Sequence, residues 1–457
     1  MKIRKDVMDL SLPIVAEQAF VMIMGVVNTI MAGHLGKEAV SAIGMVDSIN
    51  NIFIAFFSAL AVGVTVVIAQ YSGQSNYRKA NDTVFHGIVS SVIISVLITM
   101  LIYIFRAGIV KLLYGSADQG VLDNAYTYLN ITLLTYPLIA ATSISSGVLR
   151  GVGDTKTPMK ISIIMNILNV ILSYSLIYGI NISNSHFSIG TPALGVKGAA
   201  LGIAIARTIG AFLSLYTLIS GSKMVKLSVS RNFKVDFDIL RSIFGVGLPA
   251  SIESLLFNFG RLITQVFIVG LGTASIAGNY VANSVFGLLT IPGNALCLSA
   301  TTMVGQSMGR GESNEAKSTL LYLTKIASFC MLLISALAFP FARILASLYT
   351  NDTEVITIAA SLIRTAAFSL PIFWPLSFIL PSGLKGAGDA KYTMVIAIFS
   401  MWVFRIGTGY ILCVSAGLGV MGVWFGMYID WVVRTIFFYG RLQGEKWKNK
   451  VVIKTSR

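Results

Sequence analysis

The chain has 457 residues, of which 55% are hydrophobic and only 12% are charged. Many of its apolar runs reach the roughly 20 residues that a helix needs to cross a bilayer. This composition excludes a soluble enzyme and predicts an all-α, multi-pass membrane protein. The net charge of +15 would suit a nucleic-acid partner. However, the basic residues gather in the connections and tails, so we expect the lipid bilayer, and no nucleic acid, as the partner.

Twelve apolar segments are predicted to cross the membrane. In chain order they are 11–33, 48–69, 84–106, 126–148, 159–180, 195–220, 244–270, 282–304, 320–342, 360–383, 393–415 and 419–440. The first follows the basic start Met1-Lys2-Ile3-Arg4-Lys5, which is typical of a signal peptide. Its apolar stretch is too long for a signal peptide and leads into further spans, so we expect it to be retained.

The distribution of basic residues predicts the orientation. The even-numbered connections and both tails are rich in Lys and Arg, whereas the odd-numbered connections hold mainly Lys37, Lys111 and Arg343. Because basic loops stay on the cytoplasmic side, both termini are predicted to be cytoplasmic. We expect a plasma membrane of the bacterial inner-membrane type.

The sequence contains the same pattern twice. Pro13, followed by Glu17, matches Pro249, followed by Glu253, at a separation of 236 residues. At the same separation Gln70 matches Gln306, and Gly73 matches Gly309. Further along, Leu149-Arg150-Gly151-Val152-Gly153-Asp154 recurs as Leu384-Lys385-Gly386-Ala387-Gly388-Asp389. Such a fixed separation indicates a duplication.

Each repeat covers six spans, and an even number gives both halves the same orientation. The halves are therefore predicted to form two six-helix lobes related by a pseudo-twofold axis along the membrane normal. The predicted domains are an N-terminal lobe at 1–220, a cytoplasmic linker at 221–243, a C-terminal lobe at 244–441 and a basic cytoplasmic tail at 442–457.

Prolines inside the spans predict local bends, because proline removes a backbone donor and crowds the preceding turn. Pro371, Pro375 and Pro381 fall in one span, and we predict a bend there. For the single prolines Pro137 and Pro292 we favour the simpler interpretation, since membrane helices carry more proline than soluble ones.

Several of these residues together resemble the multidrug and toxic compound extrusion (MATE) family. They are Asn28 to Gly33 at the end of span 1, Gln70 and Gly73 after span 2, and the duplicated Leu-(Arg/Lys)-Gly-x-Gly-Asp. The resemblance covers essentially the whole chain. It implies a secondary antiporter that exports organic cations and other amphiphilic drugs in exchange for Na⁺ or H⁺. It also implies no cofactor, and we expect a monomer.

The chain departs from the family pattern at two places. Many members carry Asp in span 1 where this chain has Asn28, and an acidic residue in span 10 where the region around Trp374 has none. Asn28 can coordinate a cation but cannot release a proton. Glu17 and Glu253 are therefore the leading candidates for coupling, and Glu253 resembles the span-7 glutamate of many members. A Na⁺ site near Asn28 or Glu253 is the alternative.

A carboxylate inside a span is costly and marks a functional candidate. The structural alternative for Glu17 and Glu253 is a carboxylate near a helix start, favoured by the helix dipole. For Asp47 we favour an exposed cap of span 2 over a coupling role. The remaining candidates for a cavity lining, with interhelical hydrogen bonding as the equal alternative, are Asn166, Asn169, Asn258, Asn279, Tyr280 and Asn283.

Four arginines lie within predicted spans. Asp430 and Arg434, four residues apart on one helix face, are predicted to form a structural ion pair. Arg207 and Arg405 each require an acidic partner that the sequence does not name. Together with Arg261 these cations keep open a second function, a lipid-linked oligosaccharide flippase whose substrate bears a pyrophosphate. The sequence has no phosphate-binding Gly-x-x-x-x-Gly-Lys-(Ser/Thr) motif, which argues against ATP as the energy source.

Overall fold

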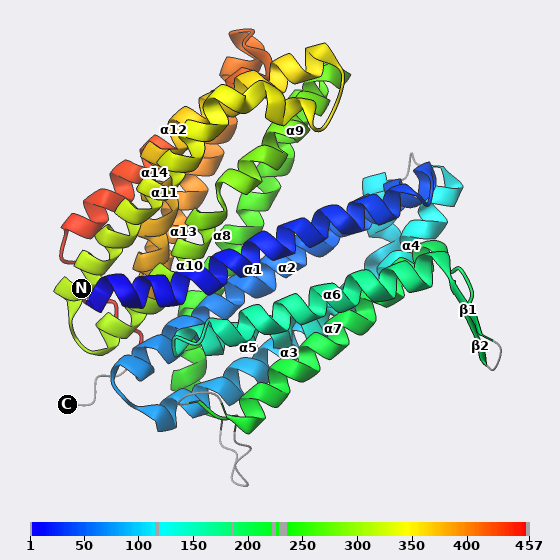
Figure 1. The fold of residues 1–457 in the computed structure, drawn as a ribbon. Helices are drawn as coiled ribbons and strands as arrows, with labels where there is room; N and C mark the ends of the chain where they lie inside the picture. Colours follow the sequence, from blue (N-terminus) through cyan, green and yellow to red (C-terminus); the bar gives the residue numbers. More distant parts are fainter. Residues whose placement is uncertain (1, 115–117, 185–186, 222–224, 228–234, 454–457) are drawn as a thin grey trace. The chain divides into compact units, whose positions relative to one another are not determined.

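The computed structural model describes residues 2–114, 118–184, 187–221, 225–227 and 235–453. Nearly all of these residues are helical (Figure 1). The helices of the first half are α1 (Lys2–Gly33), α2 (Lys37–Gly73), α3 (Tyr77–Tyr114), α4 (Gln119–Leu133), α5 (Tyr136–Gly151), α6 (Lys156–Tyr178) and α7 (Gly195–Ser220). A short antiparallel hairpin, β1 (Ile180–Asn184) and β2 (Phe187–Thr191), lies between α6 and α7.

The second half repeats this plan. Its elements are α8 (Phe237–Val269), α9 (Thr273–Leu289), α10 (Ile291–Gly309), α11 (Ser313–Ser347), α12 (Thr353–Gly386), α13 (Ala390–Phe399), η1 (Ser400–Thr408), η2 (Ile411–Ser415) and α14 (Gly419–Gln443). The elements η1 and η2 are π-helical turns that continue α13. The sequence predicted a single continuous span at 393–415, and such π-helical stretches occur mostly at functional sites.

The described part of the chain contains ten helices long and apolar enough to cross a membrane, or up to twelve spans if each of two bent pairs is one span. Large apolar side chains such as Leu97, Ile104 and Leu337 are exposed on these helices. Apolar surfaces of this kind suit contact with lipid. The predicted multi-span, all-helical membrane fold is therefore confirmed, with the hairpin as a small addition.

The helix breaks lie at single prolines. The helices α4 and α5 meet at 48°, and α9 and α10 meet at 49°. Pro137 and Pro292 stand in the first turns of α5 and α10, where the missing N–H leaves a carbonyl of the preceding turn without its donor. Our simpler interpretation of these two prolines was wrong. By contrast, α12 is continuous across Pro371, Pro375 and Pro381, so the bend expected there stays a prediction.

The contacts divide the chain into two compact units. Unit 1 comprises Met1–Val15, Thr65–Asn76 and Arg241–Arg457, and unit 2 comprises Ala16–Val64 and Tyr77–Leu240. Within unit 1, the start of α1 joins the second half through Ser11, whose hydroxyl lies 2.9 Å from that of Ser299. Within unit 2, α6 and α7 run side by side (Figure 1).

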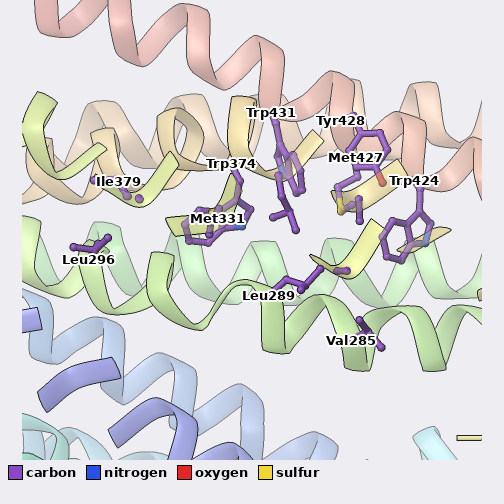
Figure 2. Packing of buried hydrophobic residues seen from close by; sticks show 14 of the residues in the cluster. Val285, Leu289, Leu296, Met331, Trp374, Ile379, Trp424, Met427, Tyr428 and Trp431 are labelled. Carbon is purple, nitrogen blue, oxygen red and sulfur yellow. The ribbon is translucent and has the colours of Figure 1, made fainter. Parts of the chain in front are cut away.

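The core of unit 1 is aromatic. Trp374 stacks on Phe378 with ring centroids 4.7 Å apart, and Trp431 stacks on Phe286 at 6.0 Å. Figure 2 shows Trp374 and Trp431 beside Met331 and Leu289. The place where many family members carry an acid in span 10 is thus filled by a buried indole, in a packed region with no room for an ion.

The end of α2 crosses α10 at a reciprocal glycine contact. A Cβ on Gly73 would lie 2.1 Å from the Gln306 carbonyl oxygen, and a Cβ on Gly309 would lie 2.0 Å from that of Gln70. Neither position can therefore accept a larger residue without moving a backbone. The duplicated Gln and Gly of the sequence make equivalent contacts with each other, which is what a locally twofold-related helix crossing requires.

Candidate functional site

The two duplicated glutamates form equivalent ion pairs, one in each unit. In unit 1, Lys385 Nζ at the end of α12 donates a hydrogen bond to Glu253 Oε1 of α8 at 2.8 Å. In unit 2, Arg150 at the end of α5 donates to Glu17 Oε1 and Oε2 of α1, at 2.8 and 2.9 Å. Each pair joins the glutamate of one duplicated motif to the cation of another.

The two pairs differ in how completely they are satisfied. Both oxygens of Glu17 accept a hydrogen bond from Arg150. Glu253 Oε2 is buried and has no hydrogen-bond partner among the described residues. The Glu253 and Lys385 side chains are each only 16% exposed. Because a buried oxygen without a partner is costly, Glu253 has one oxygen available for a proton or a small cation.

The duplicated Gly-x-Gly-Asp turns place the two cations. Gly153 and Gly388 have φ of +80° and +100°, a conformation that favours glycine. The following backbone N–H groups bond back in the same way, from Asp154 to the Leu149 carbonyl at 2.8 Å and from Asp389 to that of Leu384 at 2.9 Å. This is the hydrogen bond of a glycine-ended helix. The turns therefore end α5 and α12 with Arg150 and Lys385 in their last turns.

Asp47 belongs to a polar network inside unit 2. Asn50 Nδ2 and Tyr128 Oη donate to Asp47 Oδ1 at 3.3 and 3.2 Å, and Tyr136 Oη donates to Asn50 Oδ1 at 2.9 Å. Arg207 interacts electrostatically with Asp47. The helix α2 begins at Lys37, so Asp47 lies well inside it. The favoured interpretation of Asp47 as an exposed cap is therefore wrong, because the helix starts earlier than hydropathy indicated.

The asparagines of the first half have different surroundings. Asn28 Oδ1 is buried and has no hydrogen-bond partner in the described part of the chain. Asn166 Nδ2 donates to the Ser162 carbonyl of its own helix at 2.8 Å, and Asn169 Oδ1 accepts from Ser173 at 3.1 Å. These contacts of Asn166 and Asn169 are local to α6. Asn28 is thus the member of this group with an oxygen still available to a cation.

The polar residues of α8 and α9 separate into three environments. Asn279 accepts hydrogen bonds from Trp424 Nε1 at 2.9 Å and Asn283 Nδ2 at 3.0 Å, so these two asparagines connect α9 to α14. Asn258 bonds to the Ser254 carbonyl of its own helix. Tyr280 is 67% exposed and lines a cavity of about 510 Å³ at the end of α9. This cavity holds only Tyr280 of the predicted candidates.

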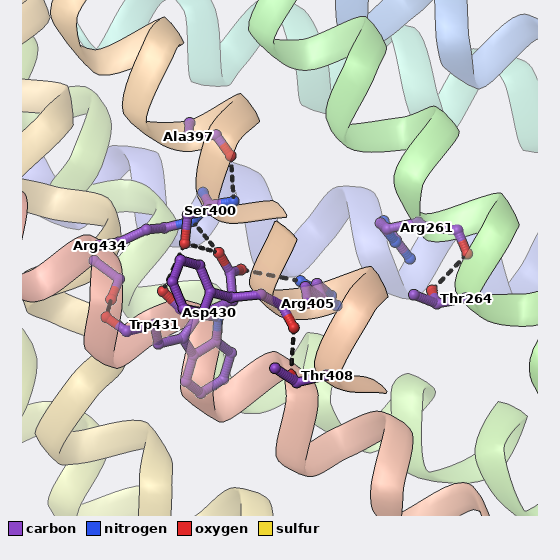
Figure 3. Close-up of polar contacts among 11 residues, drawn as sticks. Arg261, Thr264, Ala397, Ser400, Arg405, Thr408, Asp430, Trp431 and Arg434 are labelled. Atoms are coloured by element: carbon purple, nitrogen blue, oxygen red, sulfur yellow. Dashed lines mark hydrogen bonds and ion pairs between the residues drawn. The ribbon is translucent and has the colours of Figure 1, made fainter. Parts of the chain in front are cut away.

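A cluster of charges occupies the middle of unit 1 (Figure 3). Arg434 Nε donates to Asp430 Oδ1 at 2.8 Å, as predicted, and Ser400 donates to the same oxygen. Arg405 of η1 is the further cation near Asp430, with Nη1 3.9 Å from Oδ2. Asp430 is therefore the acidic partner that the sequence could not name for Arg405.

Sequence reasoning missed the partners that hold these carboxylates. Lys385 and Arg150 were recognised as members of a repeated motif, and nothing in their spacing showed that they reach Glu253 and Glu17. Tyr128 and Tyr136 were not singled out, although each hydroxyl lies within a span. Among the described residues, no group of three or more His, Cys, Asp or Glu side chains could hold a metal ion.

The comparisons with known proteins agree with this arrangement. The MatE family model matches residues 13–175 and 249–411, two segments that begin 236 residues apart. An uncharacterized transporter, YisQ, from Bacillus subtilis is 26% identical over 96% of this chain and 94% of its own length. A probable multidrug resistance protein, NorM, from Thermotoga maritima is 24% identical over 100% of this chain and 96% of its own.

Solved structures share the fold over nearly the whole chain. An outward-facing multidrug resistance MATE family transporter of the MOP superfamily is 24% identical, covers 98% of this chain and 97% of its own, and has a TM-score of 0.88. A MOP superfamily transporter from Pyrococcus furiosus is 23% identical, covers 97% of both chains, and has a TM-score of 0.88. With the family model matched in both halves, the chain belongs to the MatE family of multidrug and toxic compound extrusion transporters.

Proposed function

We propose that this transporter is a secondary antiporter that exports organic cations and other amphiphilic compounds in exchange for Na⁺ or H⁺. The observation that carries the proposal is the Glu253–Lys385 pair, a carboxylate within a span with one oxygen bonded and one left open. Such groups are retained within membrane spans mainly for function. The repeat and the family give this carboxylate an equivalent position in the first half, at Glu17.

The open oxygen suggests how an ion could act. A proton or Na⁺ at Glu253 Oε2 would cancel the charge that holds Lys385. Since one buried carboxylate cannot cheaply serve two cations, the incoming ion and Lys385 compete for it. Neutralising Glu253 would loosen the contact between α8 and the end of α12. The competition with a cationic substrate, if it enters the same site, follows the same rule.

Asp47 and Asn28 are the candidates for the ion in unit 2. Asp47 is held by neutral donors, Asn50 and Tyr128, with Arg207 nearby. Asn28 offers an amide oxygen without a partner. We propose Asp47 as the second carboxylate that responds to the ion, and Asn28 as a neutral ligand suited to Na⁺. Glu17, with both oxygens bonded, is assigned the smaller role.

The proposed architecture keeps two lobes, 1–220 and 244–441, joined by the linker at 221–243 and followed by the tail at 442–457. Both termini lie in the cytoplasm, in a plasma membrane, and the protein acts as a monomer. We propose the polar side chains of α6, α8 and α9 as substrate contacts. They are Asn166, Asn169, Asn258, Asn279, Tyr280 and Asn283.

The proposal is tested with sealed vesicles that contain the purified protein. Ethidium is loaded inside, and a Na⁺ gradient, a proton gradient or no gradient is imposed. We expect ethidium to leave faster under at least one gradient than with none. Equal rates under all three conditions, with correctly inserted protein, would contradict ion-coupled export of cations.

The flippase alternative is favoured by one observation. Arg261, Arg405 and Arg434 lie in unit 1 with Asp430 as the acid near them, and a cationic group of this kind suits a pyrophosphate. The vesicle experiment separates the two functions. A flippase would move a lipid-linked substrate between leaflets without a Na⁺ or proton gradient and would leave ethidium inside.

A further inference from the structure

The charge cluster of unit 1 is not balanced. Asp430 forms its short contacts with Arg434 and Ser400 through one oxygen, Oδ1. Arg405 approaches only the other oxygen, at 3.9 Å, which is beyond hydrogen-bond distance. Arg405 Nε and Asp430 Oδ2 are both buried and have no hydrogen-bond partner among the described residues. The Arg405 side chain is only 12% exposed, so water does little to satisfy it.

A third arginine adds to this imbalance. Arg261 of α8 interacts electrostatically with Arg405, and no acidic partner for it occurs in the described part of the chain. Figure 3 shows Arg261 on α8 and Arg405 on η1, with the Arg261 guanidinium on the side of its helix toward η1. Three arginines thus share one aspartate, which leaves two positive charges. Like charges within a membrane span repel one another strongly unless an anion joins them.

The backbone brings these two arginines together. A Cβ on Gly260 would lie 2.4 Å from Met401 Cε of η1 and 3.5 Å from Ile406 Cδ1, so the missing side chain lets α8 approach η1. Arg261 follows Gly260, and Arg405 precedes Ile406. The π-helical turn widens the helix at this point, a distortion that persists mainly where function uses it.

Aromatic rings form one wall of the cluster. The Arg405 and Arg434 guanidinium carbons lie 5.5 and 5.4 Å from the centroid of the Phe257 ring. Phe257 belongs to α8, one turn before Arg261. The cluster therefore combines an uncompensated guanidinium with an apolar aromatic surface. Arg261 is exposed, so a ligand can reach the group from its side.

We propose that Arg405 and Arg261 bind the anionic group of an amphiphilic compound, a carboxylate, sulfonate or phosphate, whose apolar body lies against Phe257. A planar guanidinium matches such oxyanions with two parallel hydrogen bonds. The anion would occupy Arg405 Nε and one Arg261 nitrogen while Asp430 remains with Arg434. This inference rests on the proposed function and adds a substrate class to it, compounds that carry an acidic group. The oxyanion belongs either to a small organic anion or to an anionic lipid headgroup.

The test uses the full-length protein in detergent and three fluorescent probes with one aromatic body: 1-pyrenebutyrate, 1-pyrenebutanol and 1-pyrenemethylammonium. We expect the parent to bind the carboxylate about tenfold more tightly than the alcohol, as one charge-assisted contact predicts. Arg405→Gln and Arg261→Gln should each remove most of that preference and leave binding of the alcohol unchanged. Arg343→Gln, which removes an exposed charge from α11, is the control and should bind like the parent.

Further arms separate the possible sources of the anion and the possible failures. Displacement of 1-pyrenebutyrate by naphthyl phosphate indicates a small organic anion, whereas displacement only by phosphatidylglycerol micelles indicates a lipid headgroup. If the parent binds the carboxylate and the alcohol equally, or if both Gln variants weaken all three probes alike, the site is not an anion site. Arg261→Gln lies at an exposed position, so it remains informative should Arg405→Gln fail to fold. Since no gradient is applied, binding can fail while ion-coupled ethidium export stands, and the reverse.

Discussion

Lys385 Nζ lies 2.8 Å from Glu253 Oε1, and it joins two motifs that the sequence carries in duplicate. Glu17 and Arg150 repeat the contact in the first half at the same distance. The repeat therefore preserves an interaction between two helices as well as a pair of residue types. The two contacts differ at the second carboxylate oxygen, which is bonded in Glu17 and open in Glu253.

The first prediction concerns this open oxygen. Glu253→Gln mimics the protonated carboxylate and removes the charge for which Lys385 and an ion compete. We expect gradient-driven ethidium efflux, normalised to inserted protein, to fall at least about tenfold, since a charge-assisted contact of about 1.5–3 kcal/mol is lost. The measurement is vesicle efflux at several pH values with and without Na⁺.

Two variants serve as comparisons for Glu253→Gln. Glu17→Gln should reduce efflux less, because both Glu17 oxygens are already bonded to Arg150. Asn28→Asp, which restores the commoner family residue, should be tolerated or shift the pH optimum. Efflux at the parent rate by Glu253→Gln under every gradient would assign that residue to structure and transfer coupling to Asp47 or Asn28.

The second prediction concerns the crossing of α2 and α10. Gly309→Val places a side chain where even a Cβ would lie 2.0 Å from the Gln70 carbonyl oxygen. We expect a loss of about 1–3 kcal/mol in stability, the usual effect of overpacking, seen as a lower melting temperature in detergent. Gly245→Val is the control, since a Cβ at Gly245 meets nothing within 4 Å. Equal melting temperatures of the two variants would mean that the crossing tolerates separation.

A third prediction concerns pH and lies outside the spans. Lys79 Nζ donates to Asp236 Oδ2 at 2.8 Å, and this contact holds the pKa of Asp236 below its ordinary value of 3.8. Because the folded pKa is the lower one, the contact stabilises the fold above about pH 4 and is lost as the pH falls through the folded value.

Asp236→Asn isolates this effect. The Asp236 Oδ1 atom also accepts from the Asp238 and Ile239 backbone N–H groups at the start of α8, and an asparagine oxygen can still accept there. We expect the melting-temperature difference between parent and variant to be largest near pH 6 and to shrink below about pH 4. A difference that stays constant with pH would show that the ion pair contributes nothing.

The fourth prediction concerns orientation. A reporter fused after Val225 should be cytoplasmic, because the connection between α7 and α8 is rich in Lys and Arg. A reporter fused after Ser183 should be external. The measurement is reporter activity on each side of the membrane in intact cells. Finding both reporters on one side would remove the twelve-span topology and the parallel arrangement of the repeats.

The sequence by itself determined the class of the protein and its internal repeat. Twelve apolar segments and a fixed separation of 236 residues are properties of the chain alone, and span length is set by bilayer thickness. The charge pair of Asp430 and Arg434 was equally accessible, because four residues bring two side chains to one helix face. These features depend on local geometry that every helix shares.

Only the tertiary structure decided which charges meet. Lys385 reaches Glu253 across 132 residues, and Arg150 reaches Glu17 across 133. Such partners depend on how helices pack, which residue spacing does not encode. The same holds for Asp47, which hydropathy placed at a helix start and packing placed beside Tyr128. The π-helical turn at Arg405 likewise arises from packing against α8, and it leaves that arginine without a full partner.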